Sequence, residues 1–258
     1  MSQSSQTYAA LAHHAYEVPQ WDPGKNEYRE VTLNGIQFKP LEYLDRPSGY
    51  QGTVYQRLDN GEIVVAHRGT DPDMRDAMAD AAMVFARVNP QATDAIELTR
   101  RAFELAARSV AKWPGTPTPE ITVTGHSLGG TLAQVTAHRF HLRGETFNAY
   151  GAASLGLGIQ PGGHTVLNHV MAGDTVGAGS PHFGQVRIYA SEKEVRTLSD
   201  PQVGYGNDDR NFTDPRAPVG AAARMLDSHL VSNFLNEDQH HKRLLSILDD
   251  PQAQQRAR

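Results

Sequence analysis

The chain has 258 residues, of which 39% are hydrophobic and 21% are charged, and its formal net charge is -5. This length and composition are typical of one main globular domain, and the negative charge gives no electrostatic reason to expect nucleic-acid binding. Cysteine is absent from the sequence, which excludes disulfides and thiolate metal sites in any redox compartment.

Two hairpins are predicted near the start of the chain, after a short helix over residues 7–16. The first alternates apolar and polar residues across residues 28–38 around the pair Asn34-Gly35, a strong hairpin signal. The second joins residues 52–58 to residues 62–67 through Asp59-Asn60-Gly61. Its last strand is apolar on both faces, which predicts a central strand covered on both sides.

That strand ends in Arg68-Gly69-Thr70-Asp71. In an acyl-transfer enzyme, a strand-end loop near the nucleophile must present hydrogen-bond donors to the developing oxyanion. Gly69 allows close backbone approach and Thr70 adds a hydroxyl group. Taken alone, the Arg-Gly-Thr sequence is more often a polar turn that ends a strand, and its combination with the serine motif described below favours the oxyanion role.

A long amphipathic helix is predicted over residues 90–113, with Asp94 and Glu97 as its capping pair. The proline-rich residues 114–119 end this helix and lead into the next strand.

Residues 121–130 contain the most informative pattern, a β-branched strand that runs into Gly-x-Ser-x-Gly and then a small-residue helix over 131–141. This is the pattern of a nucleophile elbow, in which Ser127 occupies a strained turn at the end of a sheet. Gly125 and Gly129 supply flanking positions without side chains. The five residues alone also occur at ordinary strand-to-helix turns.

Asp174 lies one residue after a strand predicted over residues 164–172, which follows another predicted over 145–152. An α/β hydrolase needs an acidic residue there to orient its histidine, although a turn aspartate that caps the next segment would look the same. We expect a further strand over 185–190 and a long loop over 191–218 that borders the substrate entrance.

His229 is the best candidate for the catalytic base among 12 histidines. The chain order Ser127, Asp174, His229 is the order of nucleophile, acid and base in α/β hydrolases. His182 follows Asp174 too soon, and the pair at 240–241 lies in a charged C-terminal segment. His138 and His141 have a metal-binding spacing, but no carboxylate cluster accompanies them, so we expect no metal site.

The motifs at residues 64–70 and 125–130 together resemble the class 3 lipases, a branch of the α/β-hydrolase fold. The resemblance covers about residues 55–234. It implies an oxyanion hole made by the N–H and hydroxyl of Thr70 and the N–H of Leu128. It also implies a lid helix over residues 72–85, where Asp80 matches an acidic residue of the family, and it assigns Asp174 and His229 to the triad.

The predicted fold is therefore an α/β-hydrolase domain over residues 1–235, followed by a polar C-terminal helix and tail over 236–258. We expect a central, mostly parallel sheet with antiparallel N-terminal hairpins and helices on both faces. Residues 71–80, at the start of the predicted lid, carry four aspartates, so we expect this segment to gain little from anionic membranes.

The predicted function is hydrolysis of glycerolipid esters, most of all phospholipids, by a Ser-His-Asp mechanism that needs no cofactor and no metal. The start of the chain shows no ordinary cleaved signal. Together with residues 8–12 and the absence of cysteine, this start resembles that of the lipase domains of bacterial antibacterial effectors. The resemblance implies a cytoplasmic protein of the producing cell, exported by a specialised secretion system, that acts on lipid at a membrane surface and meets a cognate immunity protein. A thioesterase, an acyltransferase and a non-catalytic binding module remain open alternatives.

Overall fold

The computed structural model describes residues 1–69, 81–112, 115, 117–199, 226–235 and 245–246. Within these ranges, nine strands form one sheet in the order β11-β10-β9-β8-β7-β6-β5-β4-β3. The strands are β3 (Val31–Leu33), β4 (Ile36–Asp45), β5 (Gln51–Arg57), β6 (Ile63–His67), β7 (Ile121–His126), β8 (Arg143–Phe147), β9 (Gly162–Met171), β10 (Phe183–Ala190) and β11 (Leu245–Ser246). Strands β6 to β10 are parallel, and β3 to β6 are antiparallel.

The two predicted hairpins are confirmed. Asn34 and Gly35 join β3 to β4 with φ of 49° and 76°, the left-handed pair that a two-residue hairpin turn requires. The segment predicted as one strand from residue 28 is divided, because Glu27–Tyr28 forms β2 and pairs instead with β1 (Trp21–Asp22). All five residues of β6 are buried, as predicted for a central strand.

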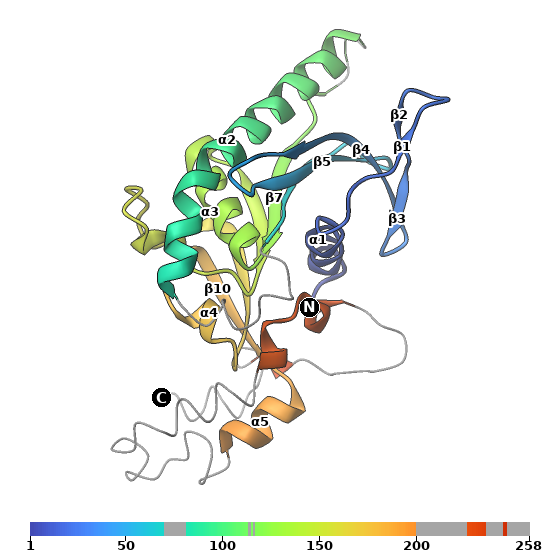
Figure 1. Ribbon diagram of the computed structural model, residues 1–258. Coiled ribbons are helices and arrows are strands. Elements are labelled where there is room, and N and C mark those ends of the chain that lie inside the picture. Colours follow the sequence, from blue (N-terminus) through green and yellow to red (C-terminus); the bar gives the residue numbers. More distant parts are fainter. Residues whose placement is uncertain (70–80, 113–114, 116, 200–225, 236–244, 247–258) are drawn as a thin grey trace.

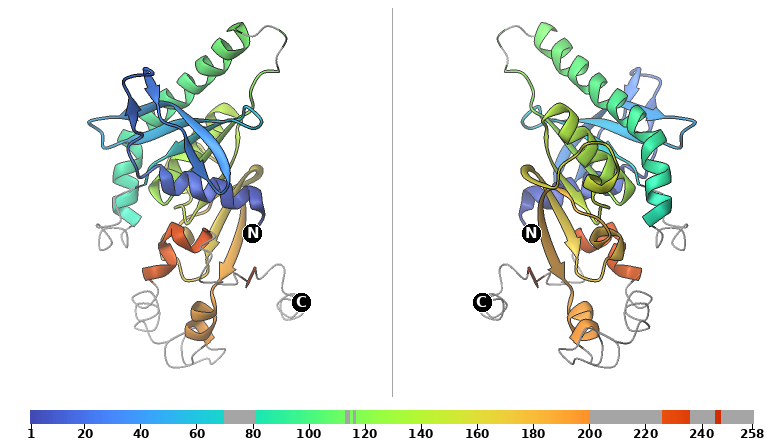
Figure 2. Two further views of the ribbon diagram at one scale, coloured as in Figure 1. Left: turned by 90° about the vertical axis from the view of Figure 1, so that its right-hand side faces the viewer. Right: turned by 90° about the vertical axis from the view of Figure 1, so that its left-hand side faces the viewer.

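Helices cover both faces of the sheet, which confirms the predicted α/β-hydrolase architecture (Figure 1). They are α1 (Gln3–His14), α2 (Ala81–Lys112), α3 (Leu128–Phe140), α4 (Thr175–Ala178) and α5 (Glu192–Ser199), with short 3-10 turns η2 (Ala152–Ser154), η4 (Leu226–His229) and η5 (Val231–Phe234). The two views of Figure 2 show opposite sides of the sheet: α1 faces the viewer in the left-hand view, and α3 faces the viewer in the right-hand view. No helix in the described ranges has an apolar stretch long enough to cross a membrane.

The prediction that a helix begins at Pro90 is wrong, because α2 begins at Ala81 and Pro90 lies inside it. A proline is a probable helix boundary but not a certain one. Asp94 and Glu97 therefore lie within the helix and do not cap it. Asp94 accepts a hydrogen bond from the Ser48 hydroxyl (2.6 Å), and Glu97 accepts one from Arg46 (2.7 Å). Of the predicted lid, residues 72–80 with Asp80 lie outside the described residues, and residues 81–85 belong to α2.

The long loop predicted over residues 191–218 is also wrong at its start, where α5 occupies Glu192–Ser199. Ser191 and Glu194 form a reciprocal capping box: the Glu194 N–H donates to Ser191 Oγ (3.2 Å), and the Ser191 N–H donates to Glu194 Oε2 (2.6 Å). The rest of the predicted loop, residues 200–218, and all of the predicted tail over 236–258 except residues 245–246 lie outside the described residues.

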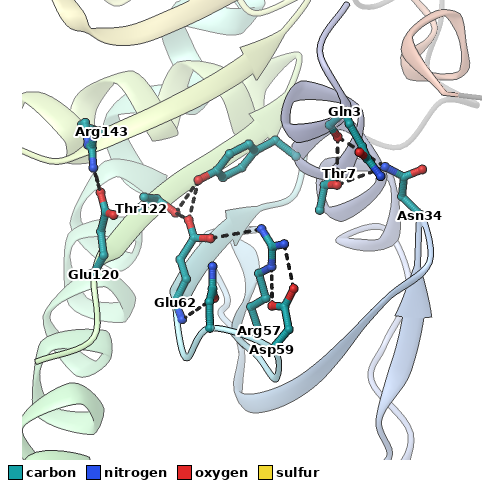
Figure 3. A network of polar contacts seen from close by, with 11 residues as sticks. Gln3, Thr7, Asn34, Arg57, Asp59, Glu62, Glu120, Thr122 and Arg143 are labelled. Atoms are coloured by element: carbon teal, nitrogen blue, oxygen red, sulfur yellow. Dashed lines mark hydrogen bonds and ion pairs between the residues drawn. The ribbon is translucent and has the colours of Figure 1, made fainter. Parts of the chain in front are cut away.

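Helix α1 is tied to the sheet by the polar contacts drawn in Figure 3. The Asn34 side chain donates to Thr7 Oγ1 (3.0 Å), which joins α1 to the first hairpin. The hydroxyls of Tyr8 and Thr122 both donate to the Glu62 carboxylate, which joins the helix to β7 and to the start of β6. These contacts fix α1 against the sheet, and Tyr16, two residues after the helix, contacts His126 at the end of β7.

Candidate active site

Ser127 lies at the turn between β7 and α3, with φ 56° and ψ -127°. A non-glycine residue in such a conformation costs about 1–3 kcal/mol and is retained only where the surroundings enforce it. Here the Ser127 N–H donates to the Phe147 carbonyl (3.0 Å), and the Ser127 carbonyl accepts from the Thr131 N–H (3.1 Å). The sheet and the first turn of α3 thus hold both sides of the strained residue.

The two glycines of the elbow allow backbone segments to pack directly against one another. A β-carbon at Gly125 would lie 2.7 Å from Gly130 N, and one at Gly129 would lie 2.7 Å from the Arg68 carbonyl carbon. Both distances are far shorter than a real carbon contact. The elbow therefore packs against the end of β6. A side chain at Gly129 would push α3 away from the end of β6, and one at Gly125 would push α3 away from β7.

Asp174 and His229 meet although 55 positions separate them along the chain. Asp174 follows β9 and caps α4, where its carboxylate accepts from the backbone N–H groups of Val176 (3.2 Å) and Gly177 (2.9 Å). The same carboxylate lies 2.8 Å from His229 Nδ1. Because a carboxylate only accepts, Nδ1 carries the proton and the His229 tautomer is fixed.

His229 Nε2 consequently presents a lone pair. This atom is buried and has no hydrogen-bond partner in the described part of the chain, and none links it to Ser127 Oγ. The His229 ring lies beside that of His126, the residue directly before Ser127, with 4.9 Å between ring centroids. The structure therefore brings Asp174 and His229 into direct contact and places the histidine next to the elbow.

The two predicted oxyanion residues are described unequally. Leu128 is buried and is the first residue of α3, a position whose N–H has no acceptor within its helix. Thr70 lies outside the described residues. The preceding residue, Gly69, packs on the elbow, since a β-carbon there would lie 2.6 Å from the His126 carbonyl oxygen.

Two buried polar residues beside the site were not predicted from the sequence, namely His126 and Asn148. His126 Nε2 donates to the His229 carbonyl (2.6 Å), and Asn148 Nδ2 donates to the Ser228 carbonyl (2.7 Å). Burial, with a smaller contribution from His229, lowers the pKa of His126 to about 3, so its ring is neutral near pH 7. The one local signal for His126 is a polar residue at the end of a fully buried strand.

His182, excluded above as the catalytic base, lies behind the site. Its Nε2–H donates to the Gly177 carbonyl (2.7 Å), which braces the turn that receives the Asp174 carboxylate. Burial lowers its pKa. In the described ranges, no group of three histidine or carboxylate side chains is arranged to hold a metal ion.

Comparison with known proteins shows that the sequence is similar to phospholipases. Residues 7–157, more than half of the chain, match the model of a family described as a phospholipase-like, Tle-like phospholipase domain. The chain is 26% identical over 238 residues to the extracellular phospholipase A1 of Serratia liquefaciens, which covers 88% of this chain and 68% of that protein.

Two solved lipases share part of the fold. The Lip2 lipase from Yarrowia lipolytica has a TM-score of 0.46 at 16% identity, covering 72% of this chain and 77% of that one. The lipase from Rhizopus microsporus var. chinensis has a TM-score of 0.48 at 19% identity, covering 73% of each chain. The fold assignment rests on the sheet order and the strand-to-helix elbow described above.

Proposed function

The chain belongs to the family of Tle-like phospholipase domains and is a carboxylic ester hydrolase, and from this premise we propose that Ser127, His229 and Asp174 form the catalytic triad of a phospholipase A. The observation that carries the proposal is a strained, buried serine whose preceding residue, His126, contacts His229, a histidine with its tautomer fixed by a buried aspartate.

In the proposed mechanism, His229 Nε2 accepts the proton of Ser127 Oγ as this oxygen attacks the ester carbonyl. Asp174 holds the imidazole and stabilises the cation that forms. The N–H groups of Leu128 and Thr70, with the Thr70 hydroxyl, donate hydrogen bonds to the carbonyl oxygen as it becomes negatively charged. The histidine then protonates the leaving alcohol, which leaves the acyl group esterified to Ser127 Oγ. A water molecule gives a proton to Nε2 as it attacks this ester, and the histidine returns the proton to Ser127 Oγ as the fatty acid leaves.

Phospholipid is the proposed substrate class for two reasons. The family is described as a phospholipase domain, and the Serratia relative is described as a phospholipase A1. The substrate would be met at a membrane surface. A cognate immunity protein, an effector role and export by a specialised secretion system stay predictions from the sequence.

Fatty-acid release from phosphatidylglycerol–phosphatidylethanolamine vesicles and from triacylglycerol emulsions tests this proposal. We expect release from the vesicles, lost in Ser127→Ala and retained in Ser232→Ala, which changes an exposed serine on η5. Vesicles with different acyl chains at the two glycerol positions identify the bond that is cleaved.

Release from triacylglycerol alone would contradict the phospholipid assignment. Vesicle hydrolysis that survives Ser127→Ala would contradict the triad. Inertness toward both lipids and toward short-chain esters would favour a binding module, and activity on acyl thioesters alone would favour a thioesterase.

A further inference from the structure

We propose that His126 and Asn148 are positioning residues for His229. His126 holds the backbone carbonyl of His229 itself, and Asn148 holds the carbonyl of the residue before it, Ser228. This inference rests on the proposed function, in which His229 is the catalytic base. His229 lies in η4, a 3-10 turn of four residues, and not in a long helix or a strand of the sheet. A catalytic imidazole on such a segment needs its backbone fixed from outside.

The His126 contact is directional. The His229 carbonyl can only accept, so His126 Nε2 carries the proton that makes the 2.6 Å hydrogen bond. The other ring nitrogen, Nδ1, then accepts from the Tyr16 hydroxyl at 2.8 Å. Tyr16 follows α1, so the hydrogen-bond chain runs from the N-terminal helix through the elbow strand to the backbone of the base.

Asn148 holds the preceding peptide unit. Its Nδ2 donates to the Ser228 carbonyl (2.7 Å), and its Oδ1 accepts from the Met171 N–H (2.9 Å). The residue is fully buried and has φ 47°, a conformation that asparagine tolerates better than most residues. Asn148 directly follows β8, which ends at Phe147 and not at residue 152 as the sequence predicted. The side chain of Asn148 ties the ends of β8 and β9 to η4.

Apolar packing alone does not replace these two contacts. Val231 and Phe234 of η5 pack in a cluster with Ala9 and Ala12 of α1, which holds the segment after His229 against the domain. Such contacts are non-directional, whereas a hydrogen bond to each carbonyl fixes the rotation of the peptide units. That rotation decides where Nε2 points.

Two amide substitutions at position 126 provide a matched test. His126→Gln places an amide nitrogen near the former Nε2 and retains a donor to the His229 carbonyl. His126→Asn is equally polar but reaches only the former Nδ1 position. On a water-soluble short-chain ester, we expect kcat to fall about 10- to 100-fold in His126→Asn and by less than about threefold in His126→Gln, with KM nearly unchanged in both.

Asn148→Asp tests the second contact. Aspartate also tolerates a positive φ and retains an acceptor for the Met171 N–H, but it removes the donor to the Ser228 carbonyl. We expect a kcat loss of about 10- to 100-fold with KM retained. Circular dichroism must show a folded protein at the assay temperature.

Tyr16→Phe has a matched control in Tyr50→Phe. The Tyr50 hydroxyl lies 2.7 Å from Nδ1 of the buried His67, in the same arrangement as Tyr16 and His126 but without contact to His229. We expect Tyr16→Phe to lower kcat several-fold and Tyr50→Phe to leave it within about twofold.

The two proposals fail separately. If Ser127→Ala or His229→Ala retains full kcat, the proposed function is wrong. If both abolish turnover while His126→Asn and Asn148→Asp keep wild-type kcat, only the positioning proposal is overturned. Equal losses in His126→Asn and His126→Gln would also overturn it.

Discussion

Asp174→Asn should separate the two tasks of this carboxylate. Oδ1 faces both His229 Nδ1 (2.8 Å) and the Val176 N–H (3.2 Å), whereas Oδ2 faces the Gly177 N–H (2.9 Å). All three partners donate, so an amide group must turn its NH2 toward one of these two sides.

The hydrogen-bond energies favour the side of His229. An NH2 group facing Gly177 would leave a buried backbone N–H without an acceptor, which costs about 1–3 kcal/mol. An NH2 group facing His229 leaves the Val176 N–H without its acceptor instead, but that contact is the longer and weaker of the two (3.2 Å against 2.9 Å), and the imidazole can exchange tautomers and accept at Nδ1. Nε2 then carries the proton and cannot accept one from Ser127.

We therefore expect kcat to fall about 10³- to 10⁴-fold in Asp174→Asn, as a wrong tautomer and a missing carboxylate charge imply. Stability should change by only about 1 kcal/mol, because asparagine is as good an N-cap as aspartate. Turnover of a soluble ester and thermal unfolding measured on the same samples give both quantities.

Asp227→Asn is the control, because Asp227 lies two positions before His229 but forms an exposed ion pair with Lys193 (2.8 Å). Such pairs contribute about 0–1 kcal/mol, so kcat should stay within about twofold. A folded Asp174→Asn protein with more than a tenth of the wild-type kcat would refute the assignment of Asp174.

Three further predictions concern the elbow, the buried histidines and α5. Gly129→Ala and the control Gly144→Ala both press a β-carbon onto the backbone of a neighbouring strand, so each should destabilise the fold by about 1–3 kcal/mol and lower Tm by several degrees. At temperatures below the melting range, only Gly129→Ala should lower kcat. Burial lowers the pKa of His67 and of His126 to about 3, from 6.5 when unfolded. The unfolded chain therefore binds protons that the folded chain does not. The free energy of unfolding of the protein should therefore fall by about 1.4 kcal/mol per histidine for each pH unit as the pH is lowered from about 6.5 toward 3. Equal denaturant midpoints at pH 7.5 and pH 5.5 would contradict this. Glu194→Ala leaves two backbone N–H groups without their acceptor, so it should cost about 1–3 kcal/mol in denaturant unfolding, whereas no change would contradict the capping role.

Local patterns in the sequence predicted the hairpins, the elbow strand and the fold class. A left-handed turn at Asn34-Gly35 and a glycine-flanked serine depend on the conformational limits of a few adjacent residues, so short segments are sufficient. The capping box of Ser191 and Glu194 is equally local and could have predicted α5.

The rest depends on distant contacts. Helix α2 continues through Pro90 because it packs on β5, β6 and α3, and no window of sequence contains those partners. The contact of His126 with His229 spans 103 positions, and that of Asn148 with Ser228 spans 80. A polar residue in a buried strand indicates that some partner exists but does not identify it.

The neutrality of His126 has a consequence for the chemistry. During acyl transfer, His229 becomes a cation with the His126 ring centroid 4.9 Å from its own. A second positive charge at that distance would oppose it by about 3 kcal/mol at an effective dielectric constant of 20, a rate loss of more than about a hundredfold. Because burial keeps the pKa of His126 near 3, the ring stays uncharged and can still donate from Nε2. A lysine or arginine at position 126 would supply the same hydrogen bond together with the opposing charge, so a buried histidine suits this position where a permanently charged donor does not.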